Sequence, residues 1–258
     1  MGDYELFKKQ VFGLTQIDLS CYKERQMKRR IDALITKCKI TSYEEYIRLL
    51  KTDKVRLDEF VAYLTINVSE FYRNPEQWKL LEDEMLPYLF ERFGNDLHIW
   101  SAACSTGDEP YTLVMLLAKF IPLDKIHVYA TDIDRQVLEK AQIGIYDEKS
   151  LKGLPKEFVS KYFTQVSDRS YQISDQIKRC VKFCQHNLLK DRYPKECDMI
   201  VCRNVMIYFT EEAKKEIYQK FNASLKKDGL LFVGSTEQIM NYRELGFDRH
   251  TSFFFEKK

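Results

Sequence analysis

The stretch that decides the fold runs from His98 to Tyr111 and reads H-I-W-S-A-A-C-S-T-G-D-E-P-Y. Residues 97–100, at the start of this stretch and including the leucine just before it, are apolar-rich and aromatic, which predicts a short buried strand. Gly107 permits the positive φ of a tight turn, and Pro110 is tolerated in the first turn of a helix, here expected over 111–120. A strand, a tight glycine turn and a helix N-terminus together are typical of the start of a nucleotide-binding α/β domain.

The acidic residues after this glycine narrow the class of ligand. Only one glycine is present, so the phosphate-binding pattern G-x-G-x-x-G is missing. Asp108 and Glu109 stand where a pyrophosphate would need positive potential. Two carboxylates favour a cation instead, such as the α-ammonium group of S-adenosylmethionine. The other interpretation, that these acids only complement the helix dipole, stays open from the residues alone.

Length and composition indicate an ordinary globular protein. The chain has 258 residues, of which 45% are hydrophobic and 31% charged, and its net charge is only +2. No general attraction to nucleic acid or to a membrane surface follows from that charge. The apolar runs are too short to span a bilayer, and the acidic N-terminus has no apolar leader, so we expect a cytoplasmic protein.

The cysteines and histidines predict no metal centre. Seven cysteines are scattered without a C-x-x-C pair, and the histidines lack zinc-ligand spacing. We therefore expect free thiols, mostly buried, and histidines with structural roles. The four histidines are His98, His127, His186 and His250.

Residues 1–66 are predicted to form an all-helical N-terminal domain. Apolar residues recur there at helical spacing, and Ser42 followed by Glu45 forms a capping-box pattern. The helix over 21–39 carries seven basic and two acidic residues, a net charge of +5. This charge is either a solvated face or a docking surface for an acidic partner, and the scarcity of aromatic residues weakens the case for nucleic acid. The residues proposed for docking are Lys23, Arg25, Lys28, Arg29 and Arg30.

Residues 67–76 are expected to form a hinge that contributes to the cofactor site. Polar asparagine, serine and arginine side chains alternate there with aromatic ones, which fits a segment that closes over a ligand and equally an ordinary loop. Asn74 before Pro75 predicts the start of a helix that continues to Gly94 with a kink at Pro87.

Strands and helices alternate from His98 onward, which predicts a doubly wound α/β domain over residues 77–258. Asp132 ends the second strand, 25 residues after Gly107, at the offset where an acidic residue binds ribose hydroxyls. Asp134 is expected to cap the next helix.

A small antiparallel β-subdomain is expected as an insertion at about residues 161–185. Apolar and polar residues alternate with period two over 161–164, 170–173 and 177–184, and turn-like residues separate these runs. The main sheet then continues. Its later elements are a strand over 198–202, a helix capped by Thr210, and strands over 230–233 and 252–255.

Six stretches, in order along the chain, resemble the chemotaxis receptor methyltransferase family (CheR). They are N-V-S-E-F-Y-R (67–73), W-S-A-A-C-S-T-G-D-E-P-Y (100–111), A-T-D-I-D (130–134), N-L-L (187–189), C-R-N-V-M-I-Y-F (202–209) and D-G-L-L-F-V-G (228–234). The resemblance covers the chain nearly end to end. It implies a Rossmann-like, S-adenosylmethionine-dependent methyltransferase domain with an inserted β-subdomain, preceded by an all-helical domain.

The family transfers a methyl group from S-adenosylmethionine to glutamate side chains on the cytoplasmic helices of chemoreceptors. The resemblance therefore implies a protein-glutamate O-methyltransferase that adapts chemotaxis signalling and faces its transfer centre with Arg73 and Tyr208. Ser69 stands where the family commonly has threonine and keeps the hydroxyl. The implied cofactor contacts are Asn67, Ser69, Arg73, Glu109, Asp132, Asn187, Leu188, Arg203 and Asn204.

One departure from the family concerns how the receptor is held. Some members have a glycine-rich loop in the β-subdomain that grips a peptide at the receptor C-terminus, whereas residues 165–169 here contain no glycine. Direct docking of the basic helix on glutamate-rich receptor helices is therefore favoured. We expect a monomer that is recruited to receptor clusters without inserting into the membrane.

The chemistry needs no general base, because a glutamate with a pKa of about 4.3 is already ionised at neutral pH. Two other functions would use the same cofactor: methylation of nucleic acid, and a non-catalytic S-adenosylmethionine-binding adaptor. A nicotinamide-dependent oxidoreductase is disfavoured by the missing glycines and by Glu109.

Overall fold

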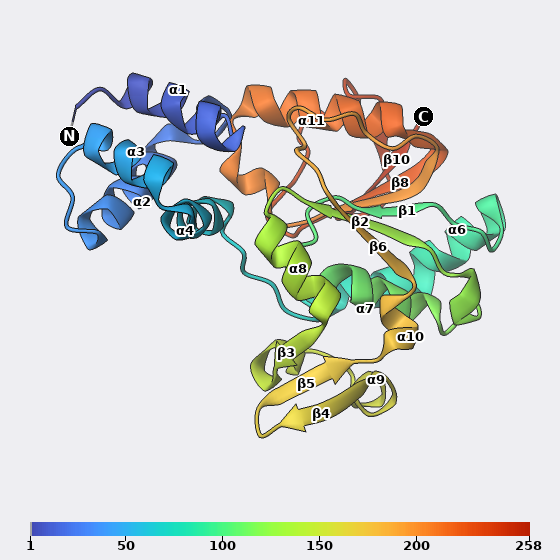
Figure 1. Cartoon of the computed structure of the whole chain (residues 1–258). Coiled ribbons are helices and arrows are strands. Elements are labelled where there is room, and N and C mark those ends of the chain that lie inside the picture. Colours follow the sequence, from blue (N-terminus) through green and yellow to red (C-terminus); the bar gives the residue numbers. More distant parts are fainter. Residues whose placement is uncertain (1) are drawn as a thin grey trace. The chain divides into compact units, whose positions relative to one another are not determined.

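The computed structural model describes residues 2–258, which form two compact units (Figure 1). The smaller unit comprises Met1–Asn67 and Tyr208–Lys215, and the larger unit comprises Val68–Ile207 and Glu216–Lys258.

The first part of the smaller unit is helical, as the apolar periodicity predicts. Its elements are α1 (Tyr4–Thr15), the short 3₁₀ helix η1 (Leu19–Cys21), α2 (Glu24–Lys37), α3 (Tyr43–Thr52) and α4 (Lys54–Thr65). The Ser42 side chain accepts a hydrogen bond from the backbone N–H of Glu45, so the predicted cap of α3 is confirmed. Phe7, Tyr43 and Phe60 are buried and pack ring against ring, which ties α1, α3 and α4 together.

The second part of the smaller unit is a segment from much later in the chain. The backbone N–H of Lys23 donates to the carbonyl of Tyr208 over 2.9 Å, and that of Thr210 donates to the carbonyl of Cys21 over 2.9 Å. The rings of Tyr22 and Phe209 lie 4.9 Å apart. The entry to the basic helix α2 is therefore fixed by residues about 190 positions away in sequence.

The larger unit contains a main sheet of seven strands in the order β6-β2-β1-β7-β8-β10-β9. Its strands are β1 (Ile99–Ser101), β2 (Val128–Asp132), β6 (Val181–Gln185), β7 (Cys197–Cys202), β8 (Leu225–Val233), β9 (Phe247–Arg249) and β10 (Phe254–Lys257). The first five strands of this order run parallel, and β10 and β9 add antiparallel pairs at the edge. The predicted doubly wound sheet is confirmed.

Helices pack on both faces of this sheet. The helical elements from Pro75 onward are α5 (Pro75–Leu80), the π-helical turn η2 (Leu81–Met85), α6 (Leu86–Phe93), α7 (Asp108–Leu117), η3 (Leu123–Lys125), α8 (Arg135–Ile143), η4 (Glu148–Leu151), α9 (Lys156–Tyr162), α10 (Asp175–Lys178), η5 (Met206–Tyr208) and α11 (Glu211–Ser224). α7 and α11 lie on opposite faces (Figure 1). Asp134 caps α8 through the N–H of Gln136, and Thr210 accepts from the N–H of Ala213 at the start of α11, so both predicted caps are confirmed.

The small antiparallel sheet differs from its prediction in two strands: it lacks the one expected over 177–184, and it includes β3, which was not predicted. It pairs β3 (Ile145–Asp147), β5 (Ser170–Ile173) and β4 (Phe163–Ser167) in the order β3-β5-β4. The prediction that residues 177–184 belong to the small sheet is wrong, because the strand they contribute to, β6, pairs parallel with β2 in the main sheet. Period-two alternation identifies a strand but carries no information about its partner.

Three boundaries also differ from the predictions. α7 begins at Asp108 and ends at Leu117, because Pro110 occupies its first turn, where a backbone N–H is not needed. The break in the helix over 74–94 is the π-helical turn η2, which precedes Pro87 and accommodates its missing N–H. The last strand, β10, begins at Phe254, and β9, which was not predicted, pairs with it.

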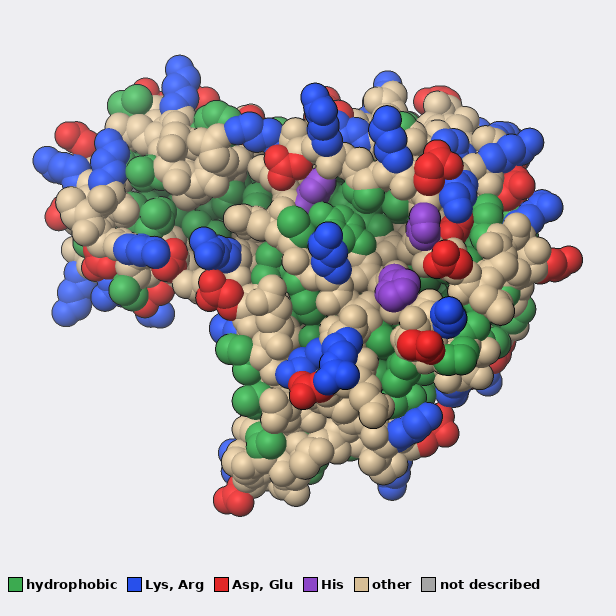
Figure 2. Space-filling view, turned by 45° about the vertical axis from the view of Figure 1, so that its right-hand side comes forward, with side chains coloured by type: hydrophobic (Ala, Val, Ile, Leu, Met, Phe, Trp, Pro, Cys, Tyr) green, Lys and Arg blue, Asp and Glu red, His purple; other side chains and the backbone are tan. Residues whose placement is uncertain are grey.

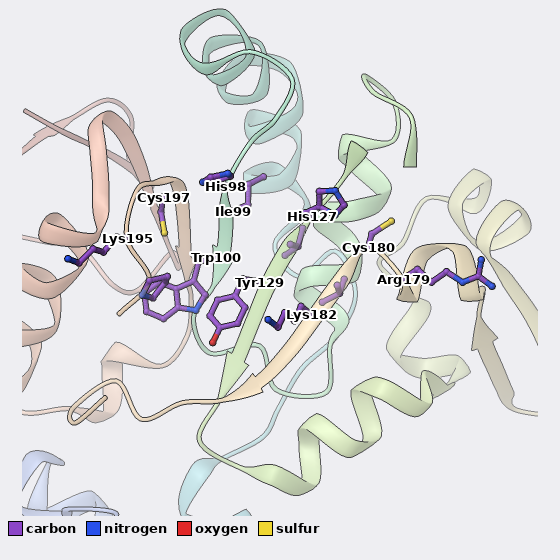
Figure 3. A pocket seen from close by; sticks show the side chains of 13 residues that line it. His98, Ile99, Trp100, His127, Tyr129, Arg179, Cys180, Lys182, Lys195 and Cys197 are labelled. Carbon is purple, nitrogen blue, oxygen red and sulfur yellow. The ribbon is translucent and has the colours of Figure 1, made fainter. Parts of the chain in front are cut away.

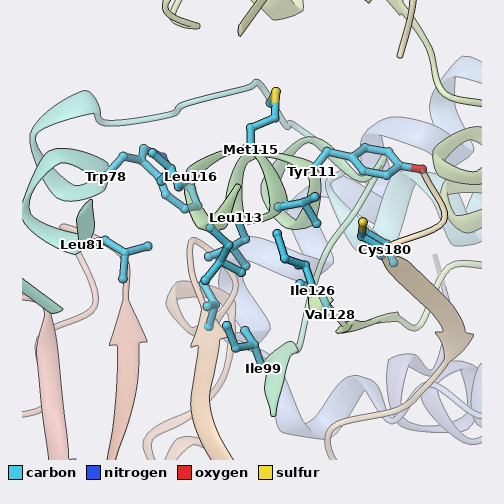
Figure 4. Packing of buried hydrophobic residues seen from close by; sticks show 14 of the residues in the cluster. Trp78, Leu81, Ile99, Tyr111, Leu113, Met115, Leu116, Ile126, Val128 and Cys180 are labelled. Carbon is cyan, nitrogen blue, oxygen red and sulfur yellow. The ribbon is translucent and has the colours of Figure 1, made fainter. Parts of the chain in front are cut away.

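The main hydrophobic core lies between α7 and one face of the sheet. Leu113 of α7, Ile99 of β1 and Val128 of β2 are each at most 3% exposed. Their side chains meet between the helix and the strands, with Trp78 of α5 beside them (Figure 4). This core surrounds α7 almost completely, so the turn that begins the helix is held rigidly.

The described residues contain no helix with the length and apolarity needed to cross a membrane. Within the same residues, no group of histidine, cysteine or acidic side chains has the arrangement of a metal site. The seven cysteines are all free thiols.

Candidate active site

The turn between β1 and α7 is fixed by glycine geometry and by hydrogen bonds. Gly107 has a φ of +90°, and a Cβ atom there would lie 2.9 Å from the Cβ of Ala141. The backbone N–H of Ser105 donates to Oδ2 of Asp132 over 2.9 Å, and the Tyr146 hydroxyl donates to the carbonyl of Thr106 over 2.7 Å. Only glycine therefore fits position 107 without strain.

The two acids after the glycine are both withdrawn from solvent. Asp108 is 1% exposed and accepts a 2.5 Å hydrogen bond from the Thr106 hydroxyl. Burial raises its pKa, and the Thr106 hydroxyl acts in the opposite direction. Glu109 accepts a 2.8 Å hydrogen bond from the Ser101 hydroxyl. Burial raises the pKa of Glu109 as well, while the charge of Arg203 lowers it.

Asp132 lies at the carboxyl end of β2, as predicted. Its Oδ1 accepts from the N–H of Asp134 over 3.0 Å, and its own carbonyl accepts from the N–H of His186 over 2.9 Å. Burial raises the pKa of Asp132 to about 6.

The His186 contact brings the predicted residues Asn187 and Leu188 to the same end of the sheet as Asp132. Oδ1 of Asn187 accepts from the N–H of Leu189 over 2.9 Å, which makes a tight turn. Leu188 is 7% exposed, and its carbonyl accepts from the Tyr193 hydroxyl over 2.7 Å. The structure thus gathers Asp132, Asn187 and the Gly107 turn where β1, β2 and β6 end.

Arg203 is the most enclosed of the predicted cofactor residues. Its Nη2 donates to Oε1 of Gln77 and to the carbonyl of Arg73, each over 2.7 Å, and its Nη1 lies 3.6 Å from Oε2 of Glu109. The guanidinium also stacks over Trp78 and Phe232, 4.8 and 4.9 Å from their ring centres. Arg203 therefore joins the end of β7 to the start of α5 and holds Glu109 in place.

The segment that contains Ser69 and Arg73 is attached to the larger unit through its aromatic residues. The N–H of Phe71 donates to the carbonyl of Ser150 over 3.0 Å, and the N–H of Tyr72 donates to the Thr112 hydroxyl over 3.3 Å. Arg73 donates from Nη1 to the carbonyl of Val68 over 3.1 Å. Ser69 is half-buried, and its hydroxyl contributes to lowering the pKa of Asp108.

One acid in this part of the larger unit was not predicted from the sequence. Glu237 is 4% exposed, and its two carboxylate oxygens accept from the backbone N–H groups of Asn204 (2.6 Å), Met206 (2.7 Å) and Gly234 (2.8 Å). Burial raises the pKa of Glu237, and these N–H groups lower it. We call Glu237 and the three N–H groups that it accepts the Glu237 clamp. Asn204, a predicted cofactor residue, belongs to this clamp and has a φ of +61°. The signal that was overlooked is an acid three residues after the glycine, Gly234, that follows β8.

The remaining predicted residues belong to the smaller unit. Asn67 donates to the Thr65 hydroxyl over 2.9 Å. Tyr208 lines a pocket of about 210 Å³ together with Lys23, Arg29, Arg30 and neighbouring residues of α2.

The basic residues of α2 divide into two sets. Arg30 donates to the carbonyl of Tyr63 over 2.6 Å and stacks on its ring, and Lys28 lies 3.4 Å from a carboxylate oxygen of Asp32. These two side chains are engaged in the fold. Arg25 and Arg29 are exposed, so they carry the charge that a partner would meet.

The arrangement in the larger unit fits S-adenosylmethionine better than a dinucleotide. The acids around Gly107 would repel a pyrophosphate, and the buried hydroxyl oxygen of Ser105 has no hydrogen-bond partner within residues 2–258, as expected where a polar ligand completes the site. Asp132 has the position of a ribose acceptor. The fold and the site together define the class of S-adenosylmethionine-dependent methyltransferases.

Comparisons with known proteins narrow this class to a family. A family model described as "CheR methyltransferase, SAM binding domain" matches residues 67–251, and one described as "CheR methyltransferase, all-alpha domain" matches residues 2–65. The chain belongs to the CheR methyltransferase family. Its cofactor is S-adenosylmethionine.

Three relatives extend the similarity over most of the chain. The chain is 42% identical to a chemotaxis protein methyltransferase of Listeria monocytogenes, with 99% of this chain and 97% of that protein covered. It is 35% identical to one of Borreliella burgdorferi, with 93% and 89% covered. It is 34% identical to one of Escherichia coli (strain K12), with 89% and 82% covered.

Proposed function

We propose that this protein transfers a methyl group from S-adenosylmethionine to glutamate side chains on the cytoplasmic helices of chemoreceptors, forming methyl esters. The observation that carries the proposal is the similarity to proteins named chemotaxis protein methyltransferase, which includes the helical unit as well as the cofactor-binding unit. The match therefore covers both units and not the cofactor-binding unit alone.

The reaction is a direct methyl transfer from a positively charged sulfonium to a negatively charged glutamate carboxylate. When bound, S-adenosylmethionine supplies an electrophilic methyl group on a sulfonium. An oxygen of the ionised glutamate forms a bond to the methyl carbon, the bond from that carbon to sulfur breaks with its electron pair, and S-adenosylhomocysteine leaves. Neither proton nor general base is needed, so the work of the protein is to orient the groups and to exclude water.

Two side chains are proposed to orient the glutamate carboxylate. Arg73 supplies a guanidinium that can pair with a carboxylate, and Tyr208 supplies a hydroxyl donor. The hydrogen bond from Arg73 to Val68 supports this role, because a bond to a single backbone carbonyl leaves most of its N–H donors available.

The cofactor is proposed to contact both polar side chains and backbone. Asp132 accepts from the ribose hydroxyls, and Glu109 supplies negative charge for the amino-acid end. Arg203 acts mainly by positioning, since Gln77, Arg73 and Glu109 occupy its donors. The full proposed set is Asn67, Ser69, Arg73, Glu109, Asp132, Asn187, Leu188, Arg203 and Asn204.

The basic helix α2 is proposed to dock on the glutamate-rich receptor helix. The exposed side chains of Arg25 and Arg29, with Lys23, would pair with acidic residues near the methylated position, whereas Lys28 and Arg30 support the helix itself. We propose a cytoplasmic monomer that reaches receptor clusters through this contact.

Incubation of the protein with methyl-labelled cofactor and receptor-containing membranes tests the proposal. Labelled methanol released by alkali from the receptor band is the expected product, since esters hydrolyse in base. A control with receptors whose methylation-region glutamates are changed to alanine should lose the label. Label in added DNA or RNA would overturn the proposal in favour of a nucleic-acid methyltransferase. Cofactor binding without any labelled product would instead indicate an adaptor.

A further inference from the structure

A second pocket lies in the larger unit, at the opposite ends of the strands from Asp132. It has a volume of about 370 Å³, within the range of small-molecule sites. Residues at or just before the amino ends of β1, β2, β6 and β7 form its walls, and we call it the sheet-end pocket. It is lined by His98, Ile99, Trp100, His127, Val128, Tyr129, Arg179, Cys180, Val181, Lys182, Pro194, Lys195 and Cys197.

The pocket exists because one crossover in the sheet has no helix. The chain leaves β6 at the sheet edge and returns in β7, beyond β2 and β1, through residues 186–196. A crossover between parallel strands usually contains a helix that covers the sheet. These eleven residues, all of them described, form neither helix nor strand, so the face of β2 and β6 on this side lacks a helical cover.

Three neighbouring side chains form a row on this face, which is covered at β1 and open at β2 and β6. Trp100, Tyr129 and Lys182 are in register on β1, β2 and β6 and so project from the same face of the sheet. Trp100 is held by a 2.9 Å hydrogen bond from its Nε1 to the Thr131 hydroxyl and by edge contacts with the ring of Tyr193. Figure 3 shows the Tyr129 ring between Trp100 and Lys182. Trp100 is 1% exposed, so the aromatic surface that a ligand would meet is the Tyr129 ring, which Trp100 supports from one side and Lys182 flanks on the other.

The rim of the pocket is positively charged. Arg179, Lys182 and Lys195 are exposed, and within residues 2–258 none of these three forms an ion pair. His98 and His127 add two further nitrogen-bearing rings, and none of the lining residues is acidic. In Figure 2, lysine, arginine and histidine side chains, with some acidic ones among them, lie around apolar surface of the larger unit. An aromatic floor with an unpaired cationic rim favours a ligand that has both a flat ring and a negative charge.

We propose that the sheet-end pocket binds a small aromatic anion of the nucleoside monophosphate class, with its ring against Tyr129 and its phosphate beside Lys182. The volume suits a mononucleotide and is small for a folded partner. The pocket has neither a glycine-rich loop nor the N-terminus of a long helix, so the phosphate is held by side chains and binding should depend strongly on salt. The site is separate from the cofactor site, because the two lie at opposite ends of the same strands.

Titration of the full-length protein with GMP tests this inference. The protein is first saturated with S-adenosylhomocysteine, so that the cofactor site is blocked, and binding is followed by calorimetry. We expect saturable binding that weakens about threefold or more between about 50 and about 200 mM salt, because salt screens the attraction between the phosphate and the basic side chains. Guanosine, which lacks the phosphate, should bind at least about tenfold more weakly than GMP.

Variants locate the binding. Lys182→Glu and Tyr129→Leu should each weaken GMP binding by about fivefold or more, whereas Lys140→Glu, an exposed change on α8, should leave it unchanged. Affinity for S-adenosylhomocysteine should be the same in all three variants, which also reports that they are folded. Absence of saturable GMP binding, or equal binding by Lys182→Glu, overturns the inference. Capture of an acidic peptide in place of GMP would overturn it in favour of a protein partner.

Discussion

Replacement of Glu237 by glutamine should weaken both the fold and cofactor binding, although Glu237 is absent from every motif that identifies the family. In the native structure the two carboxylate oxygens accept three backbone N–H groups, those of Asn204, Met206 and Gly234. A glutamine has a single oxygen, so at least one of these N–H groups is left facing the NH₂ group. Loss of one hydrogen bond to a charged acceptor costs about 1.5–3 kcal/mol, and we expect the free energy of unfolding to fall by that amount.

The same substitution should loosen the segment that carries Arg203 and Asn204. We expect affinity for S-adenosylhomocysteine to fall about tenfold, which corresponds to about 1.4 kcal/mol. Urea unfolding and isothermal calorimetry give the two numbers. The matched control is Glu244→Gln, which removes the same charge from an exposed position a few residues away and should be neutral in both assays. If Glu237→Gln behaves like this control, the clamp has no energetic role and the reasoning is refuted.

Three further outcomes are expected. Arg73→Ala should lower the rate of receptor methylation by about tenfold or more, with less than about 1 kcal/mol lost in stability, and unchanged methylation would exclude its orienting role. Burial raises the pKa of Asp132 to about 6, so most of its carboxyl groups are ionised at pH 7 and most are protonated at pH 5. Because a ribose hydroxyl donates to the ionised form, S-adenosylhomocysteine should bind about tenfold more weakly at pH 5 than at pH 7. The Asp132→Asn variant should bind S-adenosylhomocysteine weakly at both pH values. If its affinity still changed with pH, the titrating group would be one other than Asp132. Arg25→Glu with Arg29→Glu should weaken receptor methylation while cofactor affinity stays constant, whereas loss of cofactor binding would indicate misfolding.

The sequence by itself determined the local elements and, through its resemblance to a known family, the class of ligand. The single glycine at 107, between a strand and Pro110, predicts a tight turn with a positive φ, and the acids that follow it disfavour a pyrophosphate. The sequence also predicted the helices of residues 3–65 and the caps at Ser42 and Asp134, because capping and amphipathic spacing involve residues only a few positions apart.

Only the tertiary structure decided which distant elements meet. Strand β6 has the same alternation whether it pairs in a small sheet or beside β2, since the pattern describes faces and not partners. Glu237 accepts from Met206, 31 positions away, and Arg203 donates to the carbonyl of Arg73, 130 positions away. Buried polar groups must find partners, but sequence does not say which ones, because the choice depends on which chain segments come together when the core forms.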